Sequence, residues 1–179
     1  GQKRLYSAVR QQLSGGNRRK LMEINRIAVM QAYIAELIKE IRDEEQRNRA
    51  QIHLFGVSMM AGFIAARRGL DAELMQIAGL FHDYAAYKTG TAADHAHKGS
   101  FLVKGVLKEI GLTTDEENSI ICAAIFHHSD KDKTDGPYDE ALKDADTMEH
   151  VLYNFSKPVR EHEKARFEKL KTEFDLKQE

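Results

Sequence analysis

The sequence predicts an all-α fold, and three observations favour it. Apolar residues recur at helical spacing along most of the chain. No stretch shows the strict apolar–polar alternation of a half-buried strand. The 179 residues include only two prolines and twelve glycines, too few for a fold built on many tight turns. With 42% hydrophobic and 31% charged residues, the chain has the balance of a globular domain with a substantial core.

The first third of the chain is interpreted as a basic arm followed by two helices. Residues 1–20 carry basic residues and no acidic one, which indicates a loosely ordered or helical arm. From 21 to 42 the apolar residues fall on one helical stripe, and helix resumes near residue 44. No proline interrupts that second helix, and Gly69 would end it.

The middle of the chain predicts two further helices separated by a loop. Asp71 is a suitable N-cap for a helix over 72–84. Residues 85–94 are expected to form a loop, after which Asp94 could cap a helix over 95–110.

The last third predicts three more helices, for six or seven in total. Thr113 with Glu116, or Thr114 with Glu117, would form a capping box for a helix that ends near His128. A polar turn then leads to a helix from residue 139 or 140 to 153. Pro158 allows a final charged helix to about residue 174.

Composition excludes several classes of protein. The 27 basic and 28 acidic residues give a net charge of −1, from which we expect no nucleic-acid partner. No apolar run is long enough to cross a membrane, so no membrane association is expected. The single cysteine, Cys122, cannot form an internal disulfide, which indicates a cytoplasmic location.

Histidines supply the functional signal. The chain has eight, and the predicted helices place four of them on inward, largely apolar faces. Burying that many imidazoles without partners would cost a few kcal/mol each. A metal removes this cost, because a neutral imidazole donates its lone pair to it. The four inward residues, each on a different helix, are His53, His82, His95 and His128.

The histidines belong to an ordered series of short motifs. His53 is followed by the pair His82-Asp83 and, much later, by an aspartate-containing segment. The motifs around these residues are LMQIAGLFHDYA (74–85), HAHKGSFLV (95–103), AAIFHHSD (123–130) and LKDADTME (142–149). In order and local sequence they resemble the HD-domain metal-dependent phosphohydrolase superfamily. The resemblance implies an HD-domain helical bundle over 49–155, with an N-terminal arm and helix over 1–48 and a charged helix over 156–179.

The resemblance also implies a ligand set. His53, His82, Asp83 and Asp146 match the core ligands, with Asp83 bridging if two ions bind. His95 and His128 match the additional histidines of members with two metals. Helical faces do not decide between Asp144 and Asp146, and only the Ala-Asp resemblance favours Asp146.

The implied activity is hydrolysis of a phosphoester or phosphoanhydride by a metal-activated hydroxide. One or two divalent ions are expected (Fe, Mn, Co, Ni, Zn or Mg). The expected substrate is a small phosphorylated molecule, preferably a nucleotide. Asp83 and Lys88 are the catalytic candidates, and the cations that could hold the substrate phosphate are Lys88, Lys98, Lys131 and Arg49.

Two alternative functions would use the same metal-binding residues. A di-iron oxygenase of the same fold would employ the same six ligands, and a metal-stabilised signalling module would not be catalytic. The apolar stripe of helix 21–42 must also be covered. It could cap the core of this chain or pair with a second copy in a homodimer.

Overall fold

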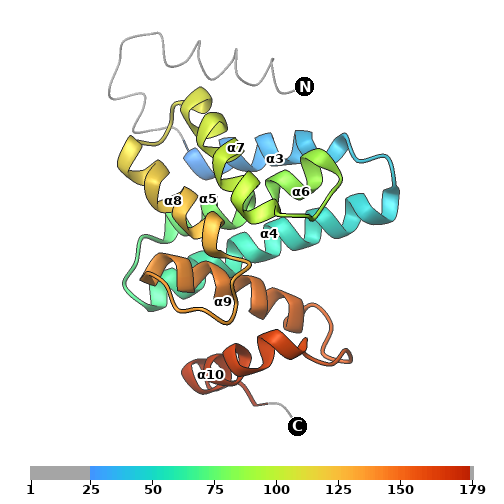
Figure 1. Cartoon of the computed structure of the whole chain (residues 1–179), viewed down its shortest axis with the longest axis vertical. Helices are drawn as coiled ribbons and strands as arrows, with labels where there is room; N and C mark the ends of the chain where they lie inside the picture. The colour runs from blue at the N-terminus through green and yellow to red at the C-terminus, as the bar shows by residue number, and fades with distance from the viewer. Residues whose placement is uncertain (1–24, 178–179) are drawn as a thin grey trace.

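The computed structural model describes residues 25–177, and within this range it contains helices and connecting segments but no strand (Figure 1). The all-α fold is therefore confirmed. The basic arm expected at residues 1–20 lies outside the described part. The helices are α3 (Arg26–Lys39), α4 (Glu44–Arg67), α5 (Ala72–Phe81), α6 (Tyr84–Thr89), α7 (His95–Ile110), α8 (Asp115–His127), α9 (Pro137–Leu152), the 3-10 turn η1 (Glu161–Glu163) and α10 (Lys164–Phe174).

Helix α5 is the centre of the fold. Its sequence is apolar on nearly every face, and seven of its ten residues are buried. Such a pattern is typical of a helix that is covered on all sides. Helix α5 contacts α3, α4, α8 and α9, and Figure 1 shows it behind α7 and α8. Its C-terminal end therefore lies in the interior, and the residue that caps it there is His82.

A glycine lets α4 and α5 approach closely. A Cβ atom on Gly79 would lie 2.7 Å from Cα of Ser58, closer than real atoms come. The Ser58 hydroxyl donates a 2.8 Å hydrogen bond to the Gln76 carbonyl across the same contact. This approach brings the middle of α4 against the end of α5, and both segments contribute to the site described below.

Helix α3 covers the core of this chain. Its apolar stripe (Met30, Tyr33, Ile34, Leu37 and Ile38) is buried, mainly against α5. Arg26 anchors the start of the helix by ion pairs with Glu73 and, at 2.9 Å, with Glu117. Of the two alternatives for this helix, capping the core of its own chain or pairing with a second copy, the first is observed, because the stripe packs within the chain.

The C-terminal helix α10 packs on α9 through both apolar and ionic contacts. Phe167 and Leu170 are 1% exposed. Arg166 donates to Glu140 at 2.8 Å and to Asp144 at 2.7 Å. These contacts hold the preceding segment, residues 153–163, against the rest of the molecule.

Two local expectations were wrong. Residues 85–89, which were expected to lie in a loop over 85–94, belong to helix α6, because Tyr84 is buried there and its hydroxyl lies 3.2 Å from that of Tyr33. Asp94 does not cap α7 with its side chain, which instead pairs with His97 at 2.7 Å. The Asp71 cap and the Thr114–Glu117 capping box are confirmed. Among the described helices, none has the length and apolarity needed to cross a membrane.

Candidate metal centre

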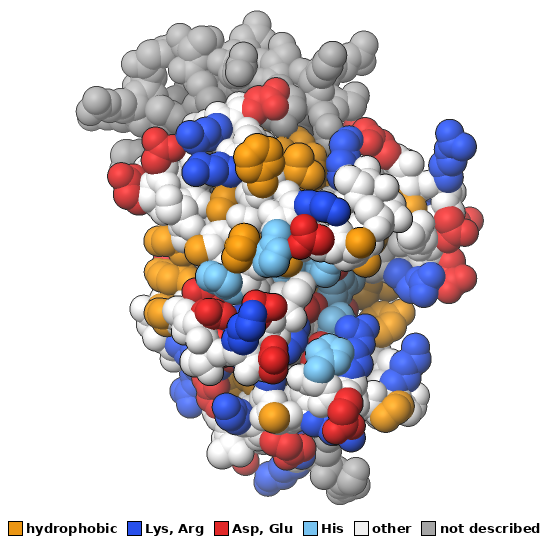
Figure 2. All heavy atoms as spheres, viewed as in Figure 1, with side chains coloured by type: hydrophobic (Ala, Val, Ile, Leu, Met, Phe, Trp, Pro, Cys, Tyr) orange, Lys and Arg blue, Asp and Glu red, His pale blue; other side chains and the backbone are white. Residues whose placement is uncertain are grey.

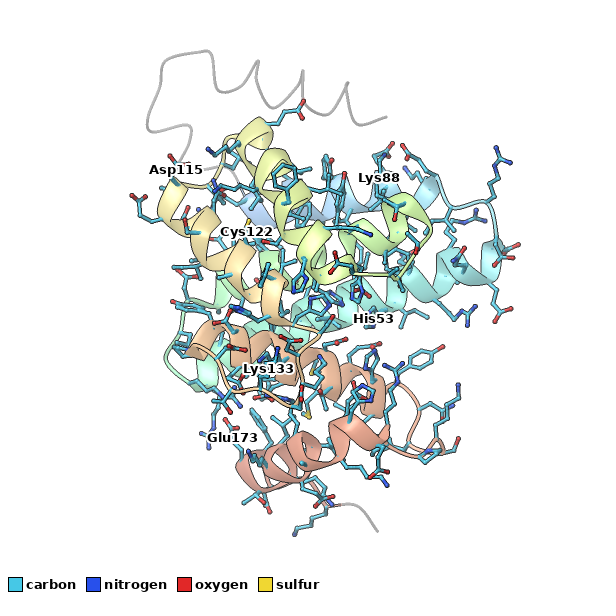
Figure 3. All side chains as sticks on the ribbon, viewed as in Figure 1. His53, Lys88, Asp115, Cys122, Lys133 and Glu173 are labelled. Carbon is cyan, nitrogen blue, oxygen red and sulfur yellow. The ribbon has the colours of Figure 1, made fainter. Side chains whose placement is uncertain are left out.

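Four histidines from four parts of the fold meet in the interior. His53 comes from α4 and His82 from the end of α5, and their Nε2 atoms lie 3.0 Å apart. His95 begins α7 and His128 caps α8, and their Nε2 atoms are also 3.0 Å apart. Figure 3 shows the labelled His53 near the middle of the molecule, and Figure 2 shows histidine side chains gathered between acidic and basic ones.

Hydrogen bonds fix which nitrogen of each ring faces inward. In every case Nδ1 donates to an acceptor of the protein, so the neutral ring presents the lone pair of Nε2 to its neighbours. The acceptors are the carbonyl oxygens of Gly79 for His82 (2.8 Å), Ala92 for His95 (2.8 Å) and Ile125 for His128 (2.7 Å), and the carboxylate of Glu149 for His53 (2.6 Å).

Each facing pair of imidazoles needs a proton or a cation between its two rings. When both rings are neutral, Nε2 atoms 3.0 Å apart have no ring proton to share, so a proton donor or a cation near both relieves their repulsion. Beside His95 and His128, the Ser129 hydroxyl is one such donor, 3.2 Å and 3.4 Å from the two Nε2 atoms. Imidazole nitrogens together with carboxylates are ligands that divalent transition metals accept. The residues therefore fit a metal centre, and clusters that could hold an ion include His53–His82–Asp83 and Asp83–His95–His128.

Asp83 lies between the two histidine pairs. Its Oδ2 is 3.4 Å from Nε2 of His53 and 3.5 Å from that of His82. Its Oδ1 is 3.0 Å from Nε2 of His95 and 3.4 Å from that of His128. Asp83 is the N-cap residue of α6, yet its side chain makes no cap hydrogen bond. Both oxygens consequently face the histidines.

The two aspartates that the sequence left open face different neighbours. Asp146 is 5% exposed, and its Oδ1 lies 3.5 Å from Nε2 of His53. That oxygen has no hydrogen-bond partner among the described residues, while Oδ2 accepts from Lys131 at 2.6 Å. Asp144 instead pairs with Arg68 at 2.6 Å and with Arg166 at 2.7 Å, on the side of α10.

The charges of the cluster shift its pKa values in opposite directions. Burial lowers the pKa of His82 to about 3. Burial also acts against a charged His53, but hydrogen bonds with Asp83 and Glu149 and the charge of Asp146 outweigh it and raise its pKa to about 10. Burial opposes ionisation of Asp83, yet the surrounding imidazoles, His82 first, hold its pKa well below the usual range. Such divergent shifts in one cluster are typical of functional sites.

Glu149 was not singled out from the sequence, although it follows Asp146 by three residues on the inward side of α9. Besides orienting His53, it lies against Gly56 of α4. A Cβ atom on Gly56 would come within 2.9 Å of Cγ of Glu149. The glycine therefore makes room for the carboxylate that holds the imidazole.

The cluster opens into a cavity of about 580 Å³. Arg49 and Lys131, two of the expected substrate-binding cations, are among its lining residues. Lys88 and Lys98 are not: Lys88 pairs with Glu40 at 3.1 Å, and Lys98 donates to the Ala93 carbonyl at 3.0 Å. Figure 3 shows Lys88 on α6, well separated from His53.

The segment after α9 supplies a wall of the cavity that sequence reasoning missed. Tyr153, Lys157, Arg160 and His162 line the cavity from this segment. Their sequence carries no motif, so only the docking of α10 reveals their position. Two other histidines lie apart from the cluster: His97 pairs with Asp94, and His127 with Asp139 at 3.0 Å.

Comparison with known families defines the class of protein. Residues 50–151 match the HD domain family. This chain belongs to that family, whose helical-bundle fold and clustered metal-ligating side chains agree with the architecture described above.

Several curated relatives that match are ribonucleases by name. Ribonuclease Y of Acetivibrio thermocellus is 35% identical over 82 residues, which is 46% of this chain and 14% of the relative. Ribonuclease Y of Mycoplasma mycoides is 38% identical over 82 residues, again 46% of this chain and 18% of the relative. Ribonuclease Y 2 of Levilactobacillus brevis is 33% identical over 97 residues, or 54% of this chain and 17% of the relative. The matches thus span less than a fifth of each relative's length. No solved structure matches significantly.

These names correct the expectation about partners. The exclusion of nucleic acid conflicts with relatives named as ribonucleases, and these names do not support the expected small nucleotide partner either. The reason lies in the use of net charge. A sum of −1 describes the whole chain and says nothing about the charges around one cavity.

Proposed function

We propose that this chain is a metal-dependent phosphodiesterase that cleaves RNA. The observation that carries the proposal is the arrangement of Asp83, whose two oxygens each face a different pair of imidazole Nε2 atoms at 3.0–3.5 Å. Such an arrangement suits a carboxylate bridging two cations. The choice of RNA is supported by the names of the relatives.

In this proposal the ligands divide between two ions. His53, His82 and Asp146 would hold one ion together with Asp83, and His95 and His128 would hold the other together with the same carboxylate. Bound divalent ions would lower the pKa of a water molecule and neutralise charge on the phosphoryl group. Lys131 positions Asp146, because its ammonium group takes up Oδ2 and leaves Oδ1 toward the histidines.

Cations at the rim of the cavity would hold further phosphates of the strand. Arg49 from α4 and Lys157 and Arg160 from the segment after α9 line the cavity. Lys157 is exposed, and its side chain makes no hydrogen bond or ion pair with the described residues. Tyr153, which is 55% exposed, offers a ring on which a base could stack. Three cations and an aromatic ring along one cavity would suit several phosphates and a base, which supports an oligonucleotide over a mononucleotide.

The test is a substrate panel on protein reconstituted with Mn²⁺, Fe²⁺, Co²⁺, Ni²⁺, Zn²⁺ or Mg²⁺. It compares a single-stranded RNA, the same sequence as DNA, mononucleotides and bis(p-nitrophenyl) phosphate. We expect cleavage of the RNA that a chelator stops and that Asp83→Asn abolishes without loss of helical circular dichroism. Asp130→Asn is the matched control, because this carboxylate pairs with Lys133 at 2.8 Å outside the cluster.

Each negative result has a distinct meaning. Cleavage of mononucleotides but not of RNA would contradict the proposed substrate. The proposed metal-dependent hydrolysis would still stand. Hydrolysis of none of the substrates with any metal would contradict the proposed enzyme.

A further inference from the structure

We propose that His150 is an additional metal-binding residue of this centre, and that Glu163 is its positioning residue. The inference rests on the proposed metal centre but adds two residues to it. Neither belongs to the six-ligand set that the family resemblance assigned, and Glu163 lies beyond the residues that match the HD domain.

His150 faces the same carboxylate oxygen as two of the proposed ligands. It lies one helical turn after Asp146 on α9, and its Nε2 is 3.4 Å from Asp146 Oδ1. The same oxygen is 3.5 Å from Nε2 of His53 and 3.7 Å from Nε2 of His82. Asp146 Oδ1 is buried and lacks a hydrogen-bond partner in the described part of the chain. A cation held by this oxygen therefore has a third imidazole nitrogen beside it.

Glu163 gives His150 the orientation of a ligand. Its Oε1 accepts a 2.8 Å hydrogen bond from Nδ1 of His150, which leaves the Nε2 lone pair directed at Asp146. Glu149 does the same for His53 at 2.6 Å. The two imidazoles stack with centroids 5.1 Å apart and planes 2° from parallel. The two carboxylate–imidazole pairs thus lie side by side and present their Nε2 atoms to one oxygen.

The burial of Glu163 is a second, independent observation. The residue is only 1% exposed, and its Oε2 has no hydrogen-bond partner within residues 25–177. An incompletely paired buried carboxylate costs free energy. A cation nearby would offset that cost, and Asp146, His150 and Glu163 form a cluster compatible with holding one.

The guanidinium of Arg160 lies where a metal ion bound by His150 would compete with it. Nη1 of Arg160 lies 3.1 Å from Nδ1 and 3.3 Å from Nε2 of His150, and 3.9 Å from Glu163. Its side chain is 56% exposed, so it can swing outward into solvent. The guanidinium would supply positive charge to the cluster when no metal is bound and give way when one is.

The experiment measures metal binding by the full chain. The protein is loaded with Co²⁺, and the dissociation constant is obtained by competition with a chelator of known affinity while the visible Co²⁺ spectrum is recorded. We expect His150→Ala and Glu163→Gln to raise the dissociation constant about tenfold or more, as loss of groups around a metal does. His150→Ala should also change the Co²⁺ spectrum.

His162→Ala is the control, because His162 lines the same cavity but is exposed and belongs to none of the ligand clusters. It should bind Co²⁺ as the unchanged protein does. If circular dichroism shows that the His150→Ala variant is unfolded, the His150→Gln variant is measured instead. We expect the same rise in its dissociation constant for Co²⁺ and the same change in its spectrum. Unaltered affinity and spectrum in a folded His150 variant would overturn the inference and leave the proposed function standing. Failure of the unchanged protein to bind Co²⁺ would overturn both.

Discussion

The Glu149 carboxylate lies 2.6 Å from Nδ1 of His53, and this hydrogen bond determines which ring nitrogen faces the metal cluster. The bond links α9 to α4, two helices that pack along much of their length. Gly56, one turn after His53, has no side chain that would collide with Glu149. The orientation of this imidazole is thus set by the packing of α9 against α4.

Loss of the Glu149 carboxylate should weaken metal binding. We expect Glu149→Gln to raise the dissociation constant for Co²⁺ or Mn²⁺ about tenfold, because the amide cannot hold the His53 ring with a full negative charge. Isothermal titration calorimetry would measure the change. Glu161→Gln is the control, since that side chain is 87% exposed and pairs with Lys164 at the surface. Equal affinities for the Glu149 variant and the control would show that the hydrogen bond does not orient the ring.

Histidines on the two sides of Asp83 should have unequal effects on two bound ions. His95 and His128 face Oδ1 of Asp83, while His53 and His82 face Oδ2. We therefore expect His95→Ala to lower the metal content from two ions to one per chain, with the remaining affinity close to that of the unchanged protein. Elemental analysis after native purification gives the content. Loss of both ions in this variant would contradict the division of ligands.

The contact between α4 and α5 should not tolerate a methyl group. A Cβ atom on Gly79 would lie 2.7 Å from Cα and 2.8 Å from N of Ser58, and neither is the movable end of a side chain. We expect Gly79→Ala to reduce the free energy of unfolding by about 1–3 kcal/mol, the usual cost of overpacking. Urea titration followed by circular dichroism measures this loss.

Gly105→Ala supplies the comparison for that variant. Gly105 lies within α7 with nothing within 4 Å of the added atom. Alanine is the better helix former, so this change should raise stability by about 0.5–1 kcal/mol. Destabilisation by both alanines to the same extent would indicate that the close approach at Gly79 has no special role.

Helical periodicity predicted most of the architecture because the core is built from regular apolar stripes. The helix over 44–68 is observed at Glu44–Arg67, and that over 95–110 at His95–Ile110. Helix α6 was missed because its stability depends on the burial of Tyr84 against another helix, which local sequence does not encode.

The inward histidines were accessible from the sequence, since a polar residue on an apolar stripe is conspicuous. Helical faces could not separate Asp146 from Asp144, and only the family resemblance favoured Asp146, because the difference lies in the docking of Arg68 and Arg166 on Asp144. Glu163 and Lys157 were also missed. They reach the cavity only through the return of the chain after α9, which no local pattern predicts.

The docking of α10 should weaken in acid. Burial opposes ionisation of Glu140, but hydrogen bonds from Arg166 and Lys143 outweigh it and lower its pKa. A carboxylate whose pKa is lower in the folded than in the unfolded chain stabilises the fold above the unfolded value, about 4.3 for Glu. This contribution is lost as the pH falls through the folded-state pKa. We therefore expect Glu140→Gln to be less stable than the unchanged protein at neutral pH.

The difference in the free energy of unfolding between the unchanged protein and the Glu140→Gln variant should stay constant down to about pH 4.3. Below that pH it should narrow, because the Glu140 carboxylate of the unchanged protein is then protonated and loses the charge that the variant lacks. Urea titrations at a series of pH values measure it. Glu168→Gln provides the control, since Glu168 is 66% exposed and pairs with Lys171 at the surface, where ion pairs contribute little. A difference that persists unchanged in acid would mean that Glu140 acts through its shape and not its charge.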